Sequence, residues 1–77
     1  MKYVYFHDYS NDGIGGIVEI SEEEWQQLEP HRDDMSNCNP LPDDLNNLVW
    51  ENIYGRGKVD KDAETLSEEE CLTQAIC

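Results

Sequence analysis

The chain has 77 residues, and because its 18 Asp and Glu outnumber five Lys and Arg, its formal net charge is −13. A compact body with this charge repels nucleic acids and anionic membranes and is attracted to basic surfaces. The length allows one small domain, residues 1–77, with a thin core, to which two Trp, four Tyr and one Phe bring large apolar areas.

Two apolar runs near the N-terminus predict an antiparallel β-hairpin. The run 2–7 alternates, with Val4 and Phe6 on one face and Tyr3, Tyr5 and His7 on the exposed face. A turn-rich stretch, 8–13, separates it from a second apolar run at 17–20. Asp12-Gly13 is expected to supply the positive φ that a tight turn requires.

A capping box predicts a helix that begins at Ser21. Ser21 is followed three residues later by Glu24, and Ile20 with Trp25 can form a hydrophobic staple. Pro30 is expected to end this helix near residue 29. The stretch 31–39 has no apolar period, so we expect an exposed loop there.

A second helix is predicted from Asn39-Pro40, since Asn caps well and Pro is tolerated in a first turn. Its apolar stripe consists of Leu41, Leu45, Leu48, Val49 and Ile53, flanked by Trp50 and Tyr54. Gly55 is expected to end it in a left-handed conformation. Val59 then either starts a short third strand or passes through.

Ser67 with Glu70 forms a second capping box, which predicts a short final helix to about Ile76. The fold class predicted from these elements is α+β. We expect a small antiparallel hairpin, or a three-stranded sheet, packed against two to three short helices.

The three cysteines, Cys38, Cys71 and Cys77, are an odd number, and no apolar leader follows Met1, so we expect a cytoplasmic protein. Cys71 is expected to be a small core residue and Cys77 an exposed terminal thiol. Zinc binding by these thiols with His7 and His31 is disfavoured because no ligand spacing supports it. The sequence predicts no metal site and no cofactor.

One segment matches the ligand pattern of a calcium-binding EF-hand loop. Asp8, Ser10 and Asp12, a glycine at the sixth position and Glu19 at the twelfth fit that pattern. The flanking sequence favours strands over helices, so a hairpin turn is preferred to a calcium loop. A small calcium-binding module stays open as an alternative function.

Enzymatic activity is not expected. Paired carboxylates such as Asp33-Asp34 and Asp43-Asp44 are too abundant to single out an acid and base pair, and no nucleophile motif or phosphate loop is visible. The basic cluster at Arg56, Lys58 and Lys61 is expected to pair internally with its acidic neighbours, which are Asp60, Asp62 and Glu64.

The acidic residues on or beside the two predicted helices form the candidate partner-binding surface. They are Glu22, Glu23, Glu24, Glu29, Asp33, Asp34, Asp43, Asp44 and Glu51. An array of carboxylates can occupy a Lys- and Arg-lined groove in place of the phosphates of a duplex. Possible aromatic anchors are Tyr9, Trp50 and Tyr54.

In its size, charge, Met1 start and α+β pattern, the chain resembles small acidic inhibitors from bacteriophages and mobile elements, including anti-CRISPR and anti-restriction proteins. The resemblance implies a stoichiometric inhibitor in the host cytoplasm that occupies the DNA or partner site of a nuclease complex, as a DNA mimic that binds no nucleic acid itself. An antitoxin or immunity protein for a basic toxin is an alternative, and an acidic surface that serves only solubility is another. Monomer and dimer are both open.

Overall fold

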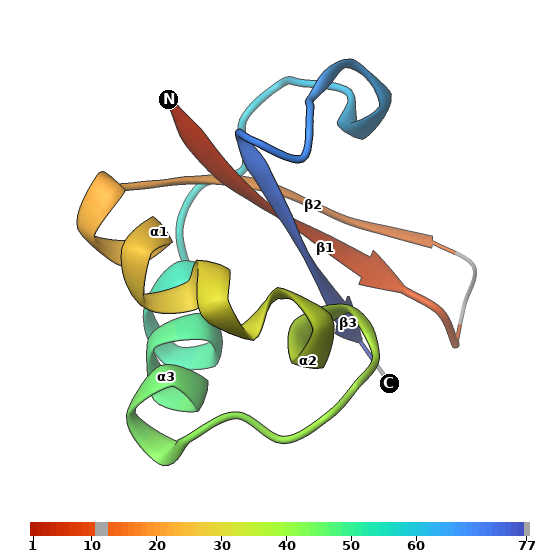
Figure 1. Ribbon diagram of the computed structural model, residues 1–77. Helices are drawn as coiled ribbons and strands as arrows, with labels where there is room; N and C mark the ends of the chain where they lie inside the picture. Colours follow the sequence, from red (N-terminus) through yellow and green to blue (C-terminus); the bar gives the residue numbers. More distant parts are fainter. Residues whose placement is uncertain (11–12, 77) are drawn as a thin grey trace.

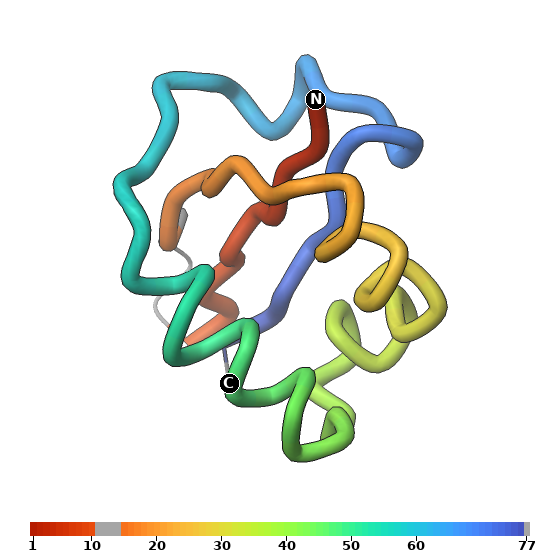
Figure 2. The backbone as a smooth tube through the Cα atoms, turned by 90° about the vertical axis from the view of Figure 1, so that its left-hand side faces the viewer, coloured from red at the N-terminus to blue at the C-terminus, as the bar shows by residue number. Residues whose placement is uncertain are grey.

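The structure is a computed structural model that describes residues 1–10 and 13–76. Its centre is a three-stranded sheet made of β1 (Lys2–Asp8), β2 (Gly13–Ile20) and β3 (Cys71–Ile76). The strand order is β2-β1-β3, so that the first strand lies between the other two (Figure 2). β2 runs antiparallel to β1 and β3 runs parallel to it.

The predicted α+β fold is confirmed, and helices cover one face of the sheet (Figure 1). In chain order they are α1 (Glu22–Leu28), the 3-10 helix η1 (Glu29–His31), α2 (Arg32–Ser36), α3 (Asp43–Asn47) and the π-helix η2 (Leu48–Ile53). A last 3-10 turn, η3 (Ala63–Thr65), precedes β3.

The core lies between this helical layer and the face of the sheet that bears Val4 and Phe6. Both side chains are fully buried, as the alternation of the first run predicted, but Tyr3, expected on the exposed face, is also buried, at 4% exposure. From the strands and helices they meet other buried side chains, which are Val18, Ile20, Leu72, Leu28, Met35, Val49 and Ile53. Burial of this apolar surface is the main force that stabilises so small a domain.

The N-terminal hairpin is confirmed, with Lys2 opposite Ile20 and Asp8 opposite Gly13. The register shifts between Phe6 and His7, and close to this irregularity Gly16 has a φ of 105°. A Cβ at Gly16 would stand 2.6 Å from Cδ of Lys58. The predicted turn residues Asn11 and Asp12 lie outside the described residues.

The expected loop over 31–39 is wrong, because α2 lies within it. Met35 is fully buried in the core, and Pro30 lies in the first turn of η1 without breaking the path of the chain. A five-residue helix has a single inward position here, so it leaves no apolar period in the sequence. The predicted end of the first helix is right, since α1 ends at Leu28.

The start predicted for the next helix is wrong by several residues. α3 begins at Asp43 after the extended Pro42, because residues that precede a proline are held out of the helical region. The helix continues through η2, where the amide of Tyr54 donates to the carbonyl of Val49. Gly55 does not take the left-handed conformation, since among the described residues Gly16 and Cys38 have positive φ.

The predicted C-terminal helix is wrong, because Cys71–Ile76 is strand β3. Ser67 and Glu70 make the expected contact, and the Ser67 amide donates to Glu70 Oε1 at 3.1 Å. That contact closes a turn, after which the chain pairs with β1 with Tyr3 opposite Cys71. Val59 forms an isolated bridge with Ile17 and no third strand of its own.

Candidate partner-binding surface

The predicted acidic surface divides into carboxylates that face solvent and one that does not. Most of the predicted residues are exposed on α1, η1, α2, α3 and η2: Glu22, Glu23, Glu29, Asp33, Asp43, Asp44 and Glu51. Asp34 is half-exposed, with its carboxylate 3.8 Å from Nδ1 of His31. The first turns of α1 and α3 therefore each present adjacent carboxylates outward.

Glu24 does not belong to this surface, because it is committed to Arg56. The guanidinium donates to both carboxylate oxygens, at 2.9 and 2.6 Å, in a bidentate pair. Glu24 Oε1 also accepts from the Ser21 amide at 2.9 Å, which completes the capping box of α1. The hydrogen bonds from Arg56 lower the pKa of Glu24 to about 2.

The pairing expected for the basic cluster is wrong. Arg56 reaches α1 instead of the acidic residues 60–64, and Lys58 donates to the Tyr54 carbonyl at 3.1 Å. The ammonium of Lys61 lies 5.4 Å from the centre of the Tyr3 ring. An ion pair with an acidic neighbour in an exposed loop stabilises the fold little. A contact with a buried ring or a carboxylate on another element holds the cation in place.

The remaining two cations also hold the fold together. Lys2 lies over the Trp25 ring at 4.5 Å and donates to the Glu69 carbonyl, and Arg32 lies 5.6 Å from the same ring. All five Lys and Arg of the chain therefore contact its own rings, carbonyls or carboxylate. The outward-facing charge of the helices is almost entirely negative.

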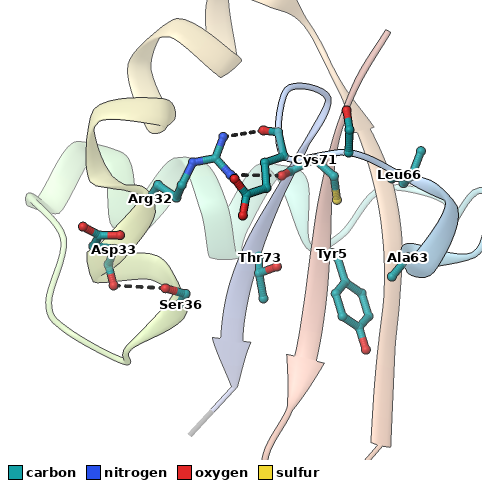
Figure 3. Close-up of a pocket in the computed structure, with 10 residues that line it drawn as sticks. Tyr5, Arg32, Asp33, Ser36, Ala63, Leu66, Cys71 and Thr73 are labelled. Carbon is teal, nitrogen blue, oxygen red and sulfur yellow. Dashed lines mark hydrogen bonds between the residues drawn. The ribbon is translucent and has the colours of Figure 1, made fainter.

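A polar cavity of about 310 Å³ lies between α2, the turn before β3 and the sheet (Figure 3). Arg32 reaches across it to donate to the carbonyls of Glu68 and Cys71, while Tyr5 and Thr73 enter it from the strands. Burial raises the pKa of the Cys71 thiol to about 11, so the thiol stays protonated and is a weak nucleophile at neutral pH.

Two of the three cysteines are described. Cys71 is half-buried and free, and Cys38 is disulfide-bonded. Cys77, expected to be an exposed thiol, lies outside the described residues. Disulfides are typical of oxidising compartments, so the bond at Cys38 does not support the predicted cytoplasmic location, which stays a prediction.

Among the described residues, two ligands of the EF-hand pattern, Asp8 and Glu19, lie at opposite ends of the hairpin. Glu19 pairs with Tyr3, whereas Asp8 is at the other end of the hairpin opposite Gly13. Gly13 and Glu19 are six positions apart along the strand, which is roughly 20 Å. Asp8 Oδ1 instead accepts hydrogen bonds from the amide and hydroxyl of Ser10, as in an Asx turn, and Asp12 lies outside the described residues.

The three predicted aromatic anchors differ in how far they are exposed to solvent. Tyr9 is 57% exposed, Tyr54 is 36% exposed, and Trp50 is half-buried against Phe6. The contacts between cations and rings were not predicted from the sequence. Most of them join residues far apart in the chain, although Lys58 and Tyr54 are neighbours on the same stretch. The alternation of Tyr5 and His7 was a usable signal for a further aromatic surface.

None of the helices in the described part of the chain is long and apolar enough to cross a bilayer. A comparison with protein-family models, with curated proteins and with solved structures finds no match to this chain.

Proposed function

We propose that this protein is a stoichiometric inhibitor that occupies the basic nucleic-acid-binding surface of a host defence nuclease complex, of the anti-CRISPR or anti-restriction type. The carboxylates of α1 and α3 stand in for nucleic-acid phosphates, in the manner of a DNA mimic. The observation that carries the proposal is the separation of charge. Carboxylates face outward on the helices, while every Lys and Arg contacts the protein itself.

The short helices suit this role because their ends present acidic side chains in fixed directions. Glu22 and Glu23 lie in the first turn of α1, and Asp43 and Asp44 lie in the first turn of α3. Carboxylates are favoured there by the helix dipole. Long-range attraction between this array and a Lys- and Arg-lined groove speeds association and is screened by salt.

The test is a panel of purified CRISPR effector complexes and restriction endonucleases, with binding of a labelled target duplex measured by fluorescence anisotropy. We expect one member of the panel to lose DNA binding at an equimolar amount of the protein. Excess unlabelled duplex should relieve the inhibition if the two compete for one surface, and moderately high salt should weaken it.

Charge reversal separates a specific surface from overall charge. The test variant carries Lys at Glu22, Glu23, Asp43 and Asp44, and the matched control carries Lys at Asp60, Asp62, Glu64 and Glu69, all of which are exposed. Both variants change the net charge equally, and both leave Glu24 in its pair with Arg56. We expect the test variant to lose inhibition and the control to keep most of it.

Equal loss in both variants, or no inhibition anywhere in the panel, contradicts the proposal. Neutralisation of a small basic toxin with no effect on any nuclease also contradicts it, and would favour the antitoxin alternative.

A further inference from the structure

The protein covers most of its aromatic rings with its own cations. Trp25 has Lys2 on it at 4.5 Å and Arg32 at 5.6 Å, both measured to the ring centre. The cluster of Phe6, Trp50 and Tyr54 has Lys58, which lies 4.5 Å from the centre of the Tyr54 ring. Tyr3 has Lys61 at 5.4 Å. In each case a positive charge meets the negative face of a ring.

One aromatic group differs from these three. Tyr5, His7 and Tyr9 follow each other at every second position, on the sheet face away from the helices. We call these three residues the aromatic row. The His7 ring lies 4.1 Å from the Tyr9 ring and 5.6 Å from the Tyr5 ring, centre to centre.

A hydrogen bond joins two members of the aromatic row, and a ring contact joins the third to them. The Tyr5 hydroxyl and Nδ1 of His7 are joined by a hydrogen bond of 2.9 Å. Burial raises the pKa of the Tyr5 hydroxyl, with Tyr9 as a second cause, so the hydroxyl stays protonated at neutral pH. Tyr5 and His7 are half-buried, while Tyr9 is among the most exposed large side chains of the described part.

Within the part of the chain that the structure describes, no Lys or Arg lies over the aromatic row. The five cations are held at Trp25, at Tyr3, at the Phe6 cluster and at Glu24. The segment before β3 crosses the same sheet face beside Tyr3 and Tyr5. Lys61 meets Tyr3 there, Val59 pairs with Ile17 opposite Tyr5, and Ala63 and Leu66 line a cavity together with Tyr5. No cation of the described residues therefore occupies the row, and its most exposed ring is that of Tyr9, in a molecule of charge −13.

We propose that the aromatic row is a docking site for an arginine-bearing segment of a basic partner protein. The charge of the whole molecule attracts such a segment, and the exposed ring of Tyr9 gives the guanidinium a flat surface on which to stack. Arginine suits the site better than lysine, since its planar and weakly hydrated guanidinium stacks on aromatic rings. The inference rests on the proposed function in one respect, namely that the partner is basic.

The probes for the test are hexa-arginine and hexa-lysine peptides, which have the same charge. Affinity for each is measured by isothermal titration calorimetry, and the contact site by NMR on the ring protons of Tyr5, His7 and Tyr9. We expect hexa-arginine to bind more tightly and to shift these ring protons. Replacement of the Tyr9 ring in Tyr9→Leu should weaken hexa-arginine binding about two- to fivefold, the range for an exposed cation–π contact.

Two further variants separate the ring face from other effects. Tyr9→Phe keeps the ring and should keep the preference for arginine. Tyr54→Leu removes another exposed tyrosine, whose ring already has Lys58 on it, and should leave peptide affinity unchanged. Equal affinity for both peptides, unmoved ring protons, or an unchanged affinity in Tyr9→Leu would each overturn the inference.

The peptide titration needs no nuclease, so the two proposals can fail separately. Arginine binding at the aromatic row without inhibition of any nuclease defeats the proposed function and leaves the docking site in place. Inhibition of a nuclease that Tyr9→Leu retains in full, with no arginine preference, defeats the docking site alone.

Discussion

The bidentate pair between Glu24 and Arg56 predicts a stability that depends on pH in a defined window. The folded pKa of Glu24 is about 2, against 4.5 for the free side chain. A shift of this size corresponds to roughly 3 kcal/mol, at about 1.36 kcal/mol for each pKa unit. Because Arg56 is 38% exposed, solvent screening reduces this value, and we expect about 1–2 kcal/mol.

The perturbation is Glu24→Gln, which keeps one oxygen acceptor and removes the charge. Since the folded pKa lies below the unfolded value, the charge stabilises the fold fully above pH 4.5 and progressively less as the pH falls towards 2. The variant should therefore be less stable than the parent by about 1–2 kcal/mol at pH 7, and the difference should fade through that window.

Urea unfolding at several pH values between 2 and 7, followed by the fluorescence of Trp25 and Trp50, measures this difference. Glu23→Gln is the matched control, because Glu23 is the neighbouring exposed carboxylate. Subtracting the unfolding free energy of the variant from that of the parent at each pH cancels the contribution of the other carboxylates, which both proteins share. A loss in Glu24→Gln that is the same at every pH, or no larger than that of Glu23→Gln, would refute the ion-pair account.

Three further predictions concern the core, the backbone and the cysteines. Met35→Ala should lower the free energy of unfolding, measured with urea, by about 2–5 kcal/mol, because the side chain is fully buried. A loss near zero would place residues 32–36 outside the core. Gly16→Ala should lower the free energy of unfolding by about 1–2 kcal/mol, since an alanine at a φ of 105° is strained and its Cβ displaces Lys58. Thermal unfolding measures this loss, and an unchanged midpoint temperature would contradict that backbone conformation. In denaturant, Cys38 should resist alkylation until a reductant is added, whereas Cys71 should react without it, as mapped by mass spectrometry. Alkylation of both without reductant would exclude the disulfide.

The hairpin and the first helix were predictable because their signals are local. Alternation over Lys2–Asp8 and the Ser21–Glu24 capping box each depend on residues within a few positions of one another. The parallel strand β3 was not predictable in the same way. The capping signal at Ser67 is real, but pairing with β1 determines the structure of residues 71–76.

The acidic surface followed from composition, since Asp and Glu are rarely buried. The exception, Glu24, depends on a contact with a residue 32 positions away, which no local pattern reports. The aromatic row was predictable from the sequence only in part. Alternation put Tyr5 and His7 on one face, but only the fold shows that the other rings have cations of their own.

The place of β3 in the sheet has a consequence for folding during protein synthesis. The central strand, residues 2–8, is made before both of its neighbours, yet one of its two edges is paired only by residues 71–76. Until residues 71–76 leave the ribosome, this edge of β1 is unpaired and the core lacks the buried side chain of Leu72. We expect nascent chains that end before Cys71 to be sensitive to protease and to chaperone binding, and protection to arise in a single late step.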